Sequence, residues 1–263
     1  GVSSVSDALQ HDLDAFIVAN RHSEHFETLK AVLLEGKNVF VEKPTVNKLD
    51  ELNAFIEMFS SNEFDGCLLY TGYNRAFSPH VSFIKDQLKD INAPIMVAYQ
   101  MNAGQLKKDN WQYDVAEGGR NIGEAVHIYH LFGALFESKV KSLSVTSING
   151  GELYKPGDNF VVTIRYENGC VGTLNYSSLG SSAYPKESFI IHSGGKTIIS
   201  ENFKNTQVVG GKSFKTPLSE KGHKEVLESF VNSIVTGVSQ MSRAEQLETM
   251  QVAFHVEKEL RGD

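Results

Sequence analysis

Lys43 is the first residue whose position suggests chemistry. It stands in Glu42-Lys43-Pro44, directly after an apolar run that ends at Val41. In an open α/β sheet, ligands lie in the crevice beyond the carboxyl ends of the strands, so a cation at this point can bind or polarise a ligand. Pro44 fixes its own φ and restricts the residue before it, which limits the movement of Lys43. For the tripeptide alone, an ordinary solvated loop lysine is the more common case.

His127 lies on a predicted helix, and an imidazole is able to move a proton because it titrates near neutral pH. Glu124 lies three residues earlier, and so on the same helix face, where it could tune the histidine or bind a ligand. The neighbours of His127 are apolar, and for the helix alone this favours a buried structural histidine.

Two histidine pairs raise the question of a metal. His22 with His25, and His127 with His130, are each three residues apart. Zinc sites use three or four protein ligands, and the zinc-binding helix of metalloproteases has its histidines four residues apart. We therefore expect no metal site.

The elements that must position Lys43 are predicted in the first seventy residues. Apolar runs at 14–19, 38–41 and 67–71 alternate with amphipathic helices at about 23–35 and 49–59. Strand, helix, strand, helix, strand at this spacing is typical of parallel βαβ units.

Beyond residue 72 the pattern becomes that of an α+β unit. An Asn-Gly turn at 168–169 joins two β-branched runs, which predicts an antiparallel hairpin. Helices are expected at about 80–89, 120–136, 221–236 and 243–260. The predicted fold class is α/β: a partial Rossmann-type parallel sheet in a domain at 1–72, and a C-terminal α+β domain at 73–263 with a large, mainly antiparallel open sheet.

Composition limits the partners. The 263 residues are 41% hydrophobic and 22% charged, which suits a soluble protein with a sizeable core. A net charge of −7 and no basic cluster argue against nucleic acid. No apolar stretch approaches the ~20 residues of a spanning helix, and no signal peptide is apparent, so no membrane partner is expected. The two cysteines lie in apolar runs, which fits a reducing cytoplasm.

Several short motifs, taken in order, resemble one enzyme family. They are Asp14-Ala15-Phe16-Ile17-Val18-Ala19, His25, Glu35-Gly36-Lys37-Asn38-Val39, Glu42-Lys43-Pro44, Gly72-Tyr73-Asn74-Arg75, Phe77-Ser78-Pro79, Trp111 with Asp114, Gly118-Gly119-Arg120, Gly123-Glu124 with His127, and Lys221-Gly222-His223. Over nearly the whole chain this series resembles the Gfo/Idh/MocA oxidoreductases, which couple a Rossmann domain to a C-terminal domain with a large open sheet.

The resemblance implies a function. It is that of an oxidoreductase using NAD or NADP, which transfers a hydride between nicotinamide and a secondary alcohol of a sugar, nucleotide sugar or cyclitol. A small carbohydrate-like substrate and a homo-oligomer, dimer or tetramer, formed through the C-terminal sheet are implied as well. The competing interpretations are a non-catalytic ligand-binding or regulatory protein on the same scaffold, and a structural oligomerisation module.

The resemblance also assigns residues. The implied catalytic residues are Lys43, His127 and Glu124. The implied cofactor-binding residues are Asn20, His25, Glu42, Lys43 and Pro44. The implied substrate-binding residues are Tyr73, Asn74, Arg75, Trp111, Asp114 and Arg120. A polar interdomain junction is the alternative for Asn74 and Arg75, and a helix-surface position is the alternative for His25.

Two features depart from the family pattern. These enzymes commonly have aspartates four residues before and three after the histidine, where this sequence has Gly123 and His130. The Gly-rich loop that holds the dinucleotide pyrophosphate has no counterpart, because no G-x-G-x-x-G occurs in the sequence. From this we expect an N-terminally truncated chain that lacks the first Rossmann strand and is weakly active or inactive.

Overall fold

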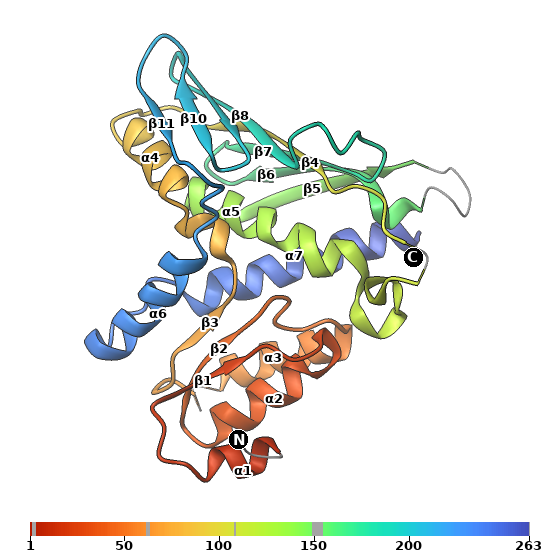
Figure 1. Ribbon diagram of the computed structural model, residues 1–263, viewed down its shortest axis with the longest axis vertical. Helices are drawn as coiled ribbons and strands as arrows, with labels where there is room; N and C mark the ends of the chain where they lie inside the picture. Colours follow the sequence, from red (N-terminus) through yellow and green to blue (C-terminus); the bar gives the residue numbers. More distant parts are fainter. Residues whose placement is uncertain (2–3, 62–63, 108, 149–154, 263) are drawn as a thin grey trace.

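Two β-sheets organise the protein in a computed structural model that describes residues 1, 4–61, 64–107, 109–148 and 155–262. The smaller sheet is parallel, in the order β1-β2-β3, and its strands are β1 (Ala15–Val18), β2 (Asn38–Val41) and β3 (Leu69–Thr71). A short helix, α1 (Val5–Leu9), precedes it. Figure 1 shows this unit at the bottom, the larger sheet at the top, and helices between them.

Strands β2 and β3 of the small sheet are buried because helices cover both faces there, whereas the edge strand β1 is partly exposed. The connecting helices are α2 (His22–Leu34) and α3 (Leu49–Ser60), as the apolar spacing predicted. The opposite face receives α6 (His223–Thr236), whose Phe230 ring lies 5.8 Å from that of Phe40 and 5.5 Å from that of Tyr70. Covering on both faces explains the continuous apolar composition of β2.

The larger sheet has eight strands in the order β11-β10-β9-β8-β4-β7-β6-β5. All neighbours are antiparallel except β4 and β7, so the sheet is mixed. The strands are β4 (Met96–Asn102), β5 (Val140–Ser147), β6 (Asn159–Tyr166), β7 (Val171–Ser177), β8 (Glu187–Ser193), β9 (Lys196–Glu201), β10 (Asn205–Val208) and β11 (Ser213–Lys215). The predicted hairpin is β6 and β7.

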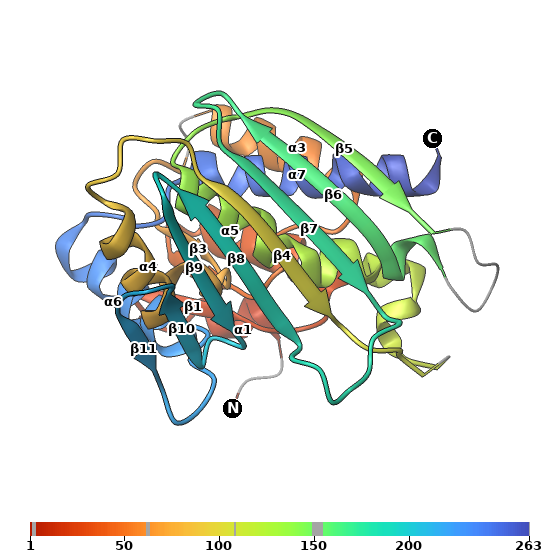
Figure 2. The same cartoon turned by 90° about the horizontal axis from the view of Figure 1, so that it is seen from above.

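One face of this sheet packs on helices, which lie behind the strands in Figure 2. These helices are α4 (Pro79–Leu88), α5 (Val126–Phe136) and α7 (Arg243–Arg261). Side chains along β4 alternate between exposed and buried, as expected for a sheet with one open face. Gly172 on β7 leaves room for Phe132 of α5, since a Cβ there would lie 2.6 Å from the ring. The helices thus pack closely against the strands.

The expected helix at 120–136 is divided in the structure. A π-helical turn, η4 (Asn121–Ala125), precedes α5. Short 3-10 turns add η1 (Asn74–Phe77), η2 (Trp111–Tyr113), η3 (Val115–Glu117) and η6 (Pro156–Asp158). Periodicity does not distinguish these turns from the α-helix, and π-turns frequently occur at functional sites.

The architecture confirms the predicted fold class. The domain division at residue 72 stays a prediction, and α7 packs against both α3 and α5. No helix in the described part of the chain is long and apolar enough to cross a bilayer.

A buried carboxylate joins the segments between the sheets. Glu187, at the start of β8, has no exposed surface and accepts from Arg75 Nε at 3.1 Å and Nη2 at 3.0 Å. It also accepts from Tyr99 Oη and Lys221 Nζ, each at 2.5 Å. Burial alone would raise the pKa of Glu187, but Arg75 and Lys221 lower it to about 2.

Glu187→Gln should destabilise the fold by about 3–5 kcal/mol at pH 7, because it leaves the buried Arg75 guanidinium without its counter-charge. The stabilisation by the Glu187 carboxylate is complete above its ordinary pKa of 4.5 and is lost as the pH falls through about 2. The free energies of unfolding of the wild type and of Glu187→Gln should therefore converge over that pH interval. Urea unfolding measures this. Glu201→Gln, an exposed carboxylate on β9, is the control, and an equal effect of both variants would contradict the prediction.

Candidate active site

Lys43 follows β2 and reaches across to the second unit. Its Nζ donates to the carbonyl oxygen of Gly123 in η4, at 2.7 Å. The Lys43–Pro44 peptide is cis. Burial lowers the pKa of Lys43, while Glu42 and Glu124 oppose that shift. The lysine is therefore held between the end of β2 and η4, and its role in binding a ligand stays a prediction.

A cavity of about 350 Å³ opens beside Lys43, at the carboxyl ends of β1 and β2. Its walls are Ala19, Asn20, Arg21, His22, His25, Glu42, Lys43 and Trp111. The structure thus brings four of the five implied cofactor-binding residues to one cavity. Pro44 lies behind it, with its carbonyl oxygen 2.7 Å from His25 Nδ1, while His25 Nε2 lies 3.2 Å from the carbonyl oxygen of Asn20. These contacts fix the ring of His25.

Trp111 and His22 form another part of the cavity wall. Their rings meet edge to face at 4.9 Å, and His22 Nδ1 lies 3.0 Å from the carbonyl oxygen of Glu117. Burial lowers the pKa of His22 to about 4, with a smaller contribution from Lys43. A Cβ on residue 123 would lie 3.1 Å from this ring, so glycine there permits the close approach. Sequence reasoning considered His22 only as a metal ligand.

His127 occupies an enclosed position on α5, with 6% of its surface exposed. Burial, then the charges of Arg75 and Lys43, lower its pKa well below 6.5. Its Nδ1 is enclosed and has no hydrogen-bond partner among the described residues. A substrate would therefore have to approach the ring from the Nε2 side.

The Glu124 side chain contacts a different set of residues from those around His127. Its carboxylate accepts from Lys186 Nζ at 2.7 Å and from the hydroxyl of Tyr176, and lies 3.6 Å from Arg120 Nη2. Burial would raise the pKa of Glu124, but Lys186, Tyr176 and Arg120 together hold it below its usual value. Within the described residues it makes no hydrogen bond to His127. Glu124, which was expected to tune His127, is thus a charged acceptor for Lys186, Tyr176 and Arg120 instead.

The implied substrate-binding residues separate into two groups. Trp111 lines the cavity, and Asp114 is exposed and accepts from the backbone N–H of Ala116. The other four are buried and have protein partners: Tyr73 donates to Met250 Sδ, Asn74 to the Lys221 carbonyl oxygen, Arg75 to Glu187, and Arg120 to Tyr176 Oη. For Asn74 and Arg75 this matches the junction alternative. Substrate contact by these residues stays a prediction.

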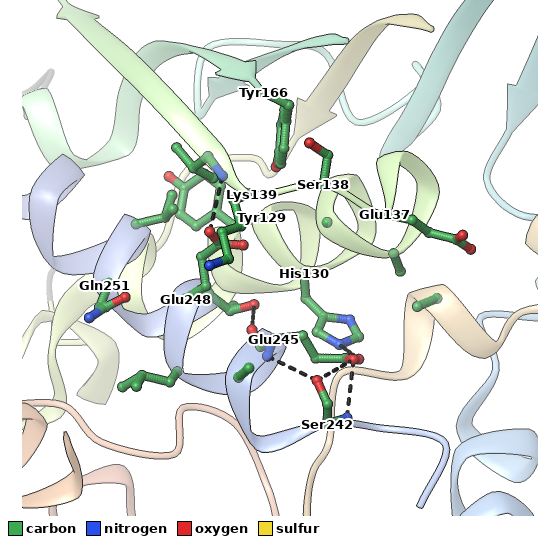
Figure 3. A pocket seen from close by; sticks show the side chains of 18 of the residues that line it. Tyr129, His130, Glu137, Ser138, Lys139, Tyr166, Ser242, Glu245, Glu248 and Gln251 are labelled. Carbon is green, nitrogen blue, oxygen red and sulfur yellow. Dashed lines mark hydrogen bonds and ion pairs between the residues drawn. The ribbon is translucent and has the colours of Figure 1, made fainter. Parts of the chain in front are cut away.

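A second cavity, of about 860 Å³, lies between α5, α7 and the start of β5 (Figure 3). There His130 Nε2 lies 3.2 Å from Glu245 Oε1, and Glu245 accepts from Ser242 at the start of α7. His127 and His130 thus have separate surroundings although they are one turn apart. In the described part of the chain, no three metal-ligating side chains lie close enough together to hold an ion.

The donor set near Lys43 fits the nicotinamide end of a dinucleotide. The cavity offers an amide, a carboxylate and an ammonium beside an aromatic wall, and ligand sites typically combine a few such polar groups with apolar surface. The sequence has no Gly-rich phosphate loop, so the fit is to the nicotinamide half alone.

Comparisons with known proteins give distant relatives. An uncharacterized oxidoreductase, YrbE, of Bacillus subtilis is 23% identical over 84% of this chain, and a myo-inositol 2-dehydrogenase of Thermotoga maritima is 22% identical over 75%. The chain spans 65% and 59% of the lengths of these two proteins. The crystal structure of the WlbA dehydrogenase from Bordetella pertussis, in complex with NADH and UDP-GlcNAcA, matches with a TM-score of 0.75 and 17% identity, over 98% of this chain and 80% of that one.

Two family profiles cover most of the sequence. Residues 1–69 match the profile described as "Oxidoreductase family, NAD-binding Rossmann fold". Residues 85–258 match "Oxidoreductase family, C-terminal alpha/beta domain". Both profiles are those of one family, and they follow each other in the order of the two sheets. The chain belongs to the Gfo/Idh/MocA oxidoreductase family.

Proposed function

We propose that the protein transfers a hydride between NAD or NADP and a secondary alcohol of a sugar, nucleotide sugar or cyclitol. One observation carries the proposal: the Lys43 ammonium binds the backbone of η4, directly before the helix that presents His127, at the edge of the cavity beyond β2. The matched NAD-binding profile and the dehydrogenase relatives support it.

The nicotinamide ring supplies the hydride acceptor when the cofactor is bound. The Lys43 ammonium donates one of its three hydrogens to the carbonyl oxygen of Gly123. The other two can be donated to the substrate oxygen and stabilise the negative charge that develops there. Trp111 provides a flat surface for a sugar ring. Because the ammonium is held by a backbone carbonyl, the substrate oxygen meets a cation whose position is already fixed.

His127 takes the hydroxyl proton at Nε2, with the ring hydrogen on Nδ1. The buried position and the nearby Lys43 and Arg75 charges favour the neutral imidazole, which is the form that can accept a proton. Glu124 remains ionised, because Lys186 and Tyr176 donate to its carboxylate and lower its pKa, and a remaining oxygen lone pair can accept from a substrate hydroxyl.

A ligand-binding protein without turnover is the second candidate. The observation that favours it is the enclosed Nδ1 of His127, which has no described acceptor to orient the ring as a general base. Binding of NAD with no reduction across a broad panel of sugars and cyclitols would support this alternative.

Saturation-transfer NMR with NAD should show the strongest transfer to the nicotinamide protons and weaker transfer to adenine, because the described polar groups meet the nicotinamide end. Lys43→Met should weaken the nicotinamide signal. Lys48→Met, which changes an exposed lysine at the start of α3, is the control. No transfer to nicotinamide would exclude the proposed cofactor site.

His127→Asn should lower kcat about 10²–10⁴-fold on any sugar that the wild type oxidises, the range for loss of a general base. Because the pKa of His127 is depressed, the neutral base persists below pH 6.5, and kcat/KM should decline only at lower pH. Steady-state rates between pH 4.5 and 8 measure this. A decline centred at or above 6.5 would rule out His127 as the base.

We also propose that the open sheet face forms a homo-oligomer. Met96, Val161 and Ile190 are 55%, 40% and 39% exposed, and strand alternation places them on this face. Apolar side chains on a broad sheet suit contact with a second copy.

Light scattering should give at least twice the 29.1 kDa chain mass at micromolar concentration. Met96→Lys with Val161→Lys should shift the protein to the monomer, because burying two lysines in an apolar interface is costly. Val235→Lys on α6 is the matched control. A wild-type monomer would refute the proposal.

A further inference from the structure

His22, the first residue of α2, has no part in the proposed hydride transfer, although it lines the same cavity as Lys43. Only 6% of its surface is exposed. Among the described residues it belongs to no group that could hold a metal ion. The partner of one ring nitrogen of a buried histidine decides what the other nitrogen can do, so the hydrogen bonds of this ring indicate its role.

The hydrogen bond at Nδ1 determines the tautomer of His22. This nitrogen lies 3.0 Å from the backbone carbonyl oxygen of Glu117. A carbonyl oxygen can only accept, so Nδ1 carries the ring hydrogen, and Nε2 of the neutral ring is then an acceptor. Nε2 has no hydrogen-bond partner in the described part of the chain, and it is not enclosed as Nδ1 of His127 and Nδ1 of His130 are. His22 thus presents an unused acceptor at the cavity.

The neighbouring segment keeps this ring in one orientation. The Glu117 carboxylate accepts from Ser23 Oγ at 3.0 Å, so η3 is tied to the first turn of α2 by two hydrogen bonds from adjacent residues. Asn47 Nδ2 donates to the carbonyl oxygen of Ala116 at 2.6 Å, which ties η3 to the segment after β2 as well. The position of the Glu117 carbonyl is therefore fixed before a ligand binds, and rotation of the His22 ring would break its hydrogen bond.

The ring of His22 is neutral over the ordinary pH range. Burial lowers its pKa to about 4, the charges of Lys43 and His25 act in the same direction, and the carbonyl and carboxylate of Glu117 oppose the shift. Nε2 therefore keeps its lone pair down to about pH 4. Lys43 and His22 thus line one cavity with opposite roles, since the ammonium donates to a ligand and the imidazole accepts from one.

Resting on the proposed function, we propose that His22 is a further substrate-binding residue, whose Nε2 accepts a hydrogen bond from a hydroxyl of the sugar or cyclitol that lies on Trp111. The centroids of the Trp111 and His22 rings are 4.9 Å apart, so a ligand on the indole lies within reach of the imidazole. Lys43 donates to the oxygen of the alcohol that is oxidised, and His22 binds a second hydroxyl. A site built to bind a hydroxyl rejects an analogue that lacks it, so His22 selects for a polyol.

The carboxamide of nicotinamide is the other donor that a ligand could bring to this cavity. The surroundings of His22 favour the substrate, because its ring contacts Trp111 and lies close to Gly123, and both belong to the C-terminal unit. The carboxamide is present in NAD alone, whereas the hydroxyl comes only with the substrate. Addition of the two ligands in turn therefore separates the two donors.

Long-range ¹H–¹⁵N NMR of the full chain, labelled with ¹⁵N-histidine, reads the state of Nε2 directly. The free protein at pH 7 should show His22 with a hydrogen on Nδ1 and none on Nε2. At least one of myo-inositol, glucose and UDP-glucose, added at saturating concentration after NAD, should shift the Nε2 resonance upfield, because its lone pair then accepts a hydrogen bond. The signals of His22 are identified by their loss in His22→Phe.

His22→Phe also gives a kinetic test. For a sugar that the wild type oxidises, it should raise KM about 3- to 10-fold, the loss of one hydrogen bond, and change kcat by less than about twofold. The phenyl ring keeps the contact with Trp111, and circular dichroism reports whether the variant is folded. His255→Phe changes a histidine of α7 whose side chain is 55% exposed, and this control should change neither constant.

A hydrogen on Nε2 of His22 in the free protein, a shift of Nε2 with NAD alone, or no shift with any of the three ligands would overturn the proposal. A fall in kcat at unchanged KM would do the same. A ligand-induced shift without saturation transfer to nicotinamide would refute the oxidoreductase proposal and leave His22 assigned as a ligand-binding residue. Saturation transfer to nicotinamide without that shift would refute only the role of His22.

Discussion

The buried carboxylate of Glu187 is the constraint on which the junction between the sheets depends. A carboxylate with no exposed surface is tolerated because Arg75, Tyr99 and Lys221 all donate to it. These donors come from η1, from β4 and from the segment before α6. One buried charge therefore fixes the position of the chain that leaves the small sheet and of the helix that returns to cover it.

The same cluster sets the electrostatics near His127. Arg75 is committed to Glu187, yet its charge still disfavours a second cation on the imidazole, and Lys43 adds to this effect. Glu124 does not offset them at the histidine, because Lys186, Tyr176 and Arg120 bind it. Structural pairing and site chemistry are thus parts of one charge network, in which each carboxylate has its own donors.

Sequence patterns predicted those parts of the fold that depend on residues close together in the chain. The strand before Lys43, the helices α2 and α3 and the β6–β7 hairpin follow from apolar periodicity and turn residues. The partners of the polar residues did not follow. Arg75 meets Glu187 from 112 residues away, and Glu124 meets Lys186 from 62 away, distances at which a sequence pattern carries no pairing information. The family resemblance assigned Arg75 and Arg120 to substrate binding, which stays a prediction, and it gave no sign of the buried partners that the structure shows for both.

The close contact between Asn102 and Gly180 determines which positions in the loop before β8 can be substituted. Gly180 has no room for a side chain, and Asn102 holds the loop through backbone carbonyls, which any residue type supplies. Ser182, Ala183 and Tyr184 line a cavity of about 710 Å³ beside this loop, and their side chains take no part in the hydrogen bonds of Asn102. Substitutions at these three positions should therefore leave the path of the loop unchanged, whereas a side chain at position 180 would displace it.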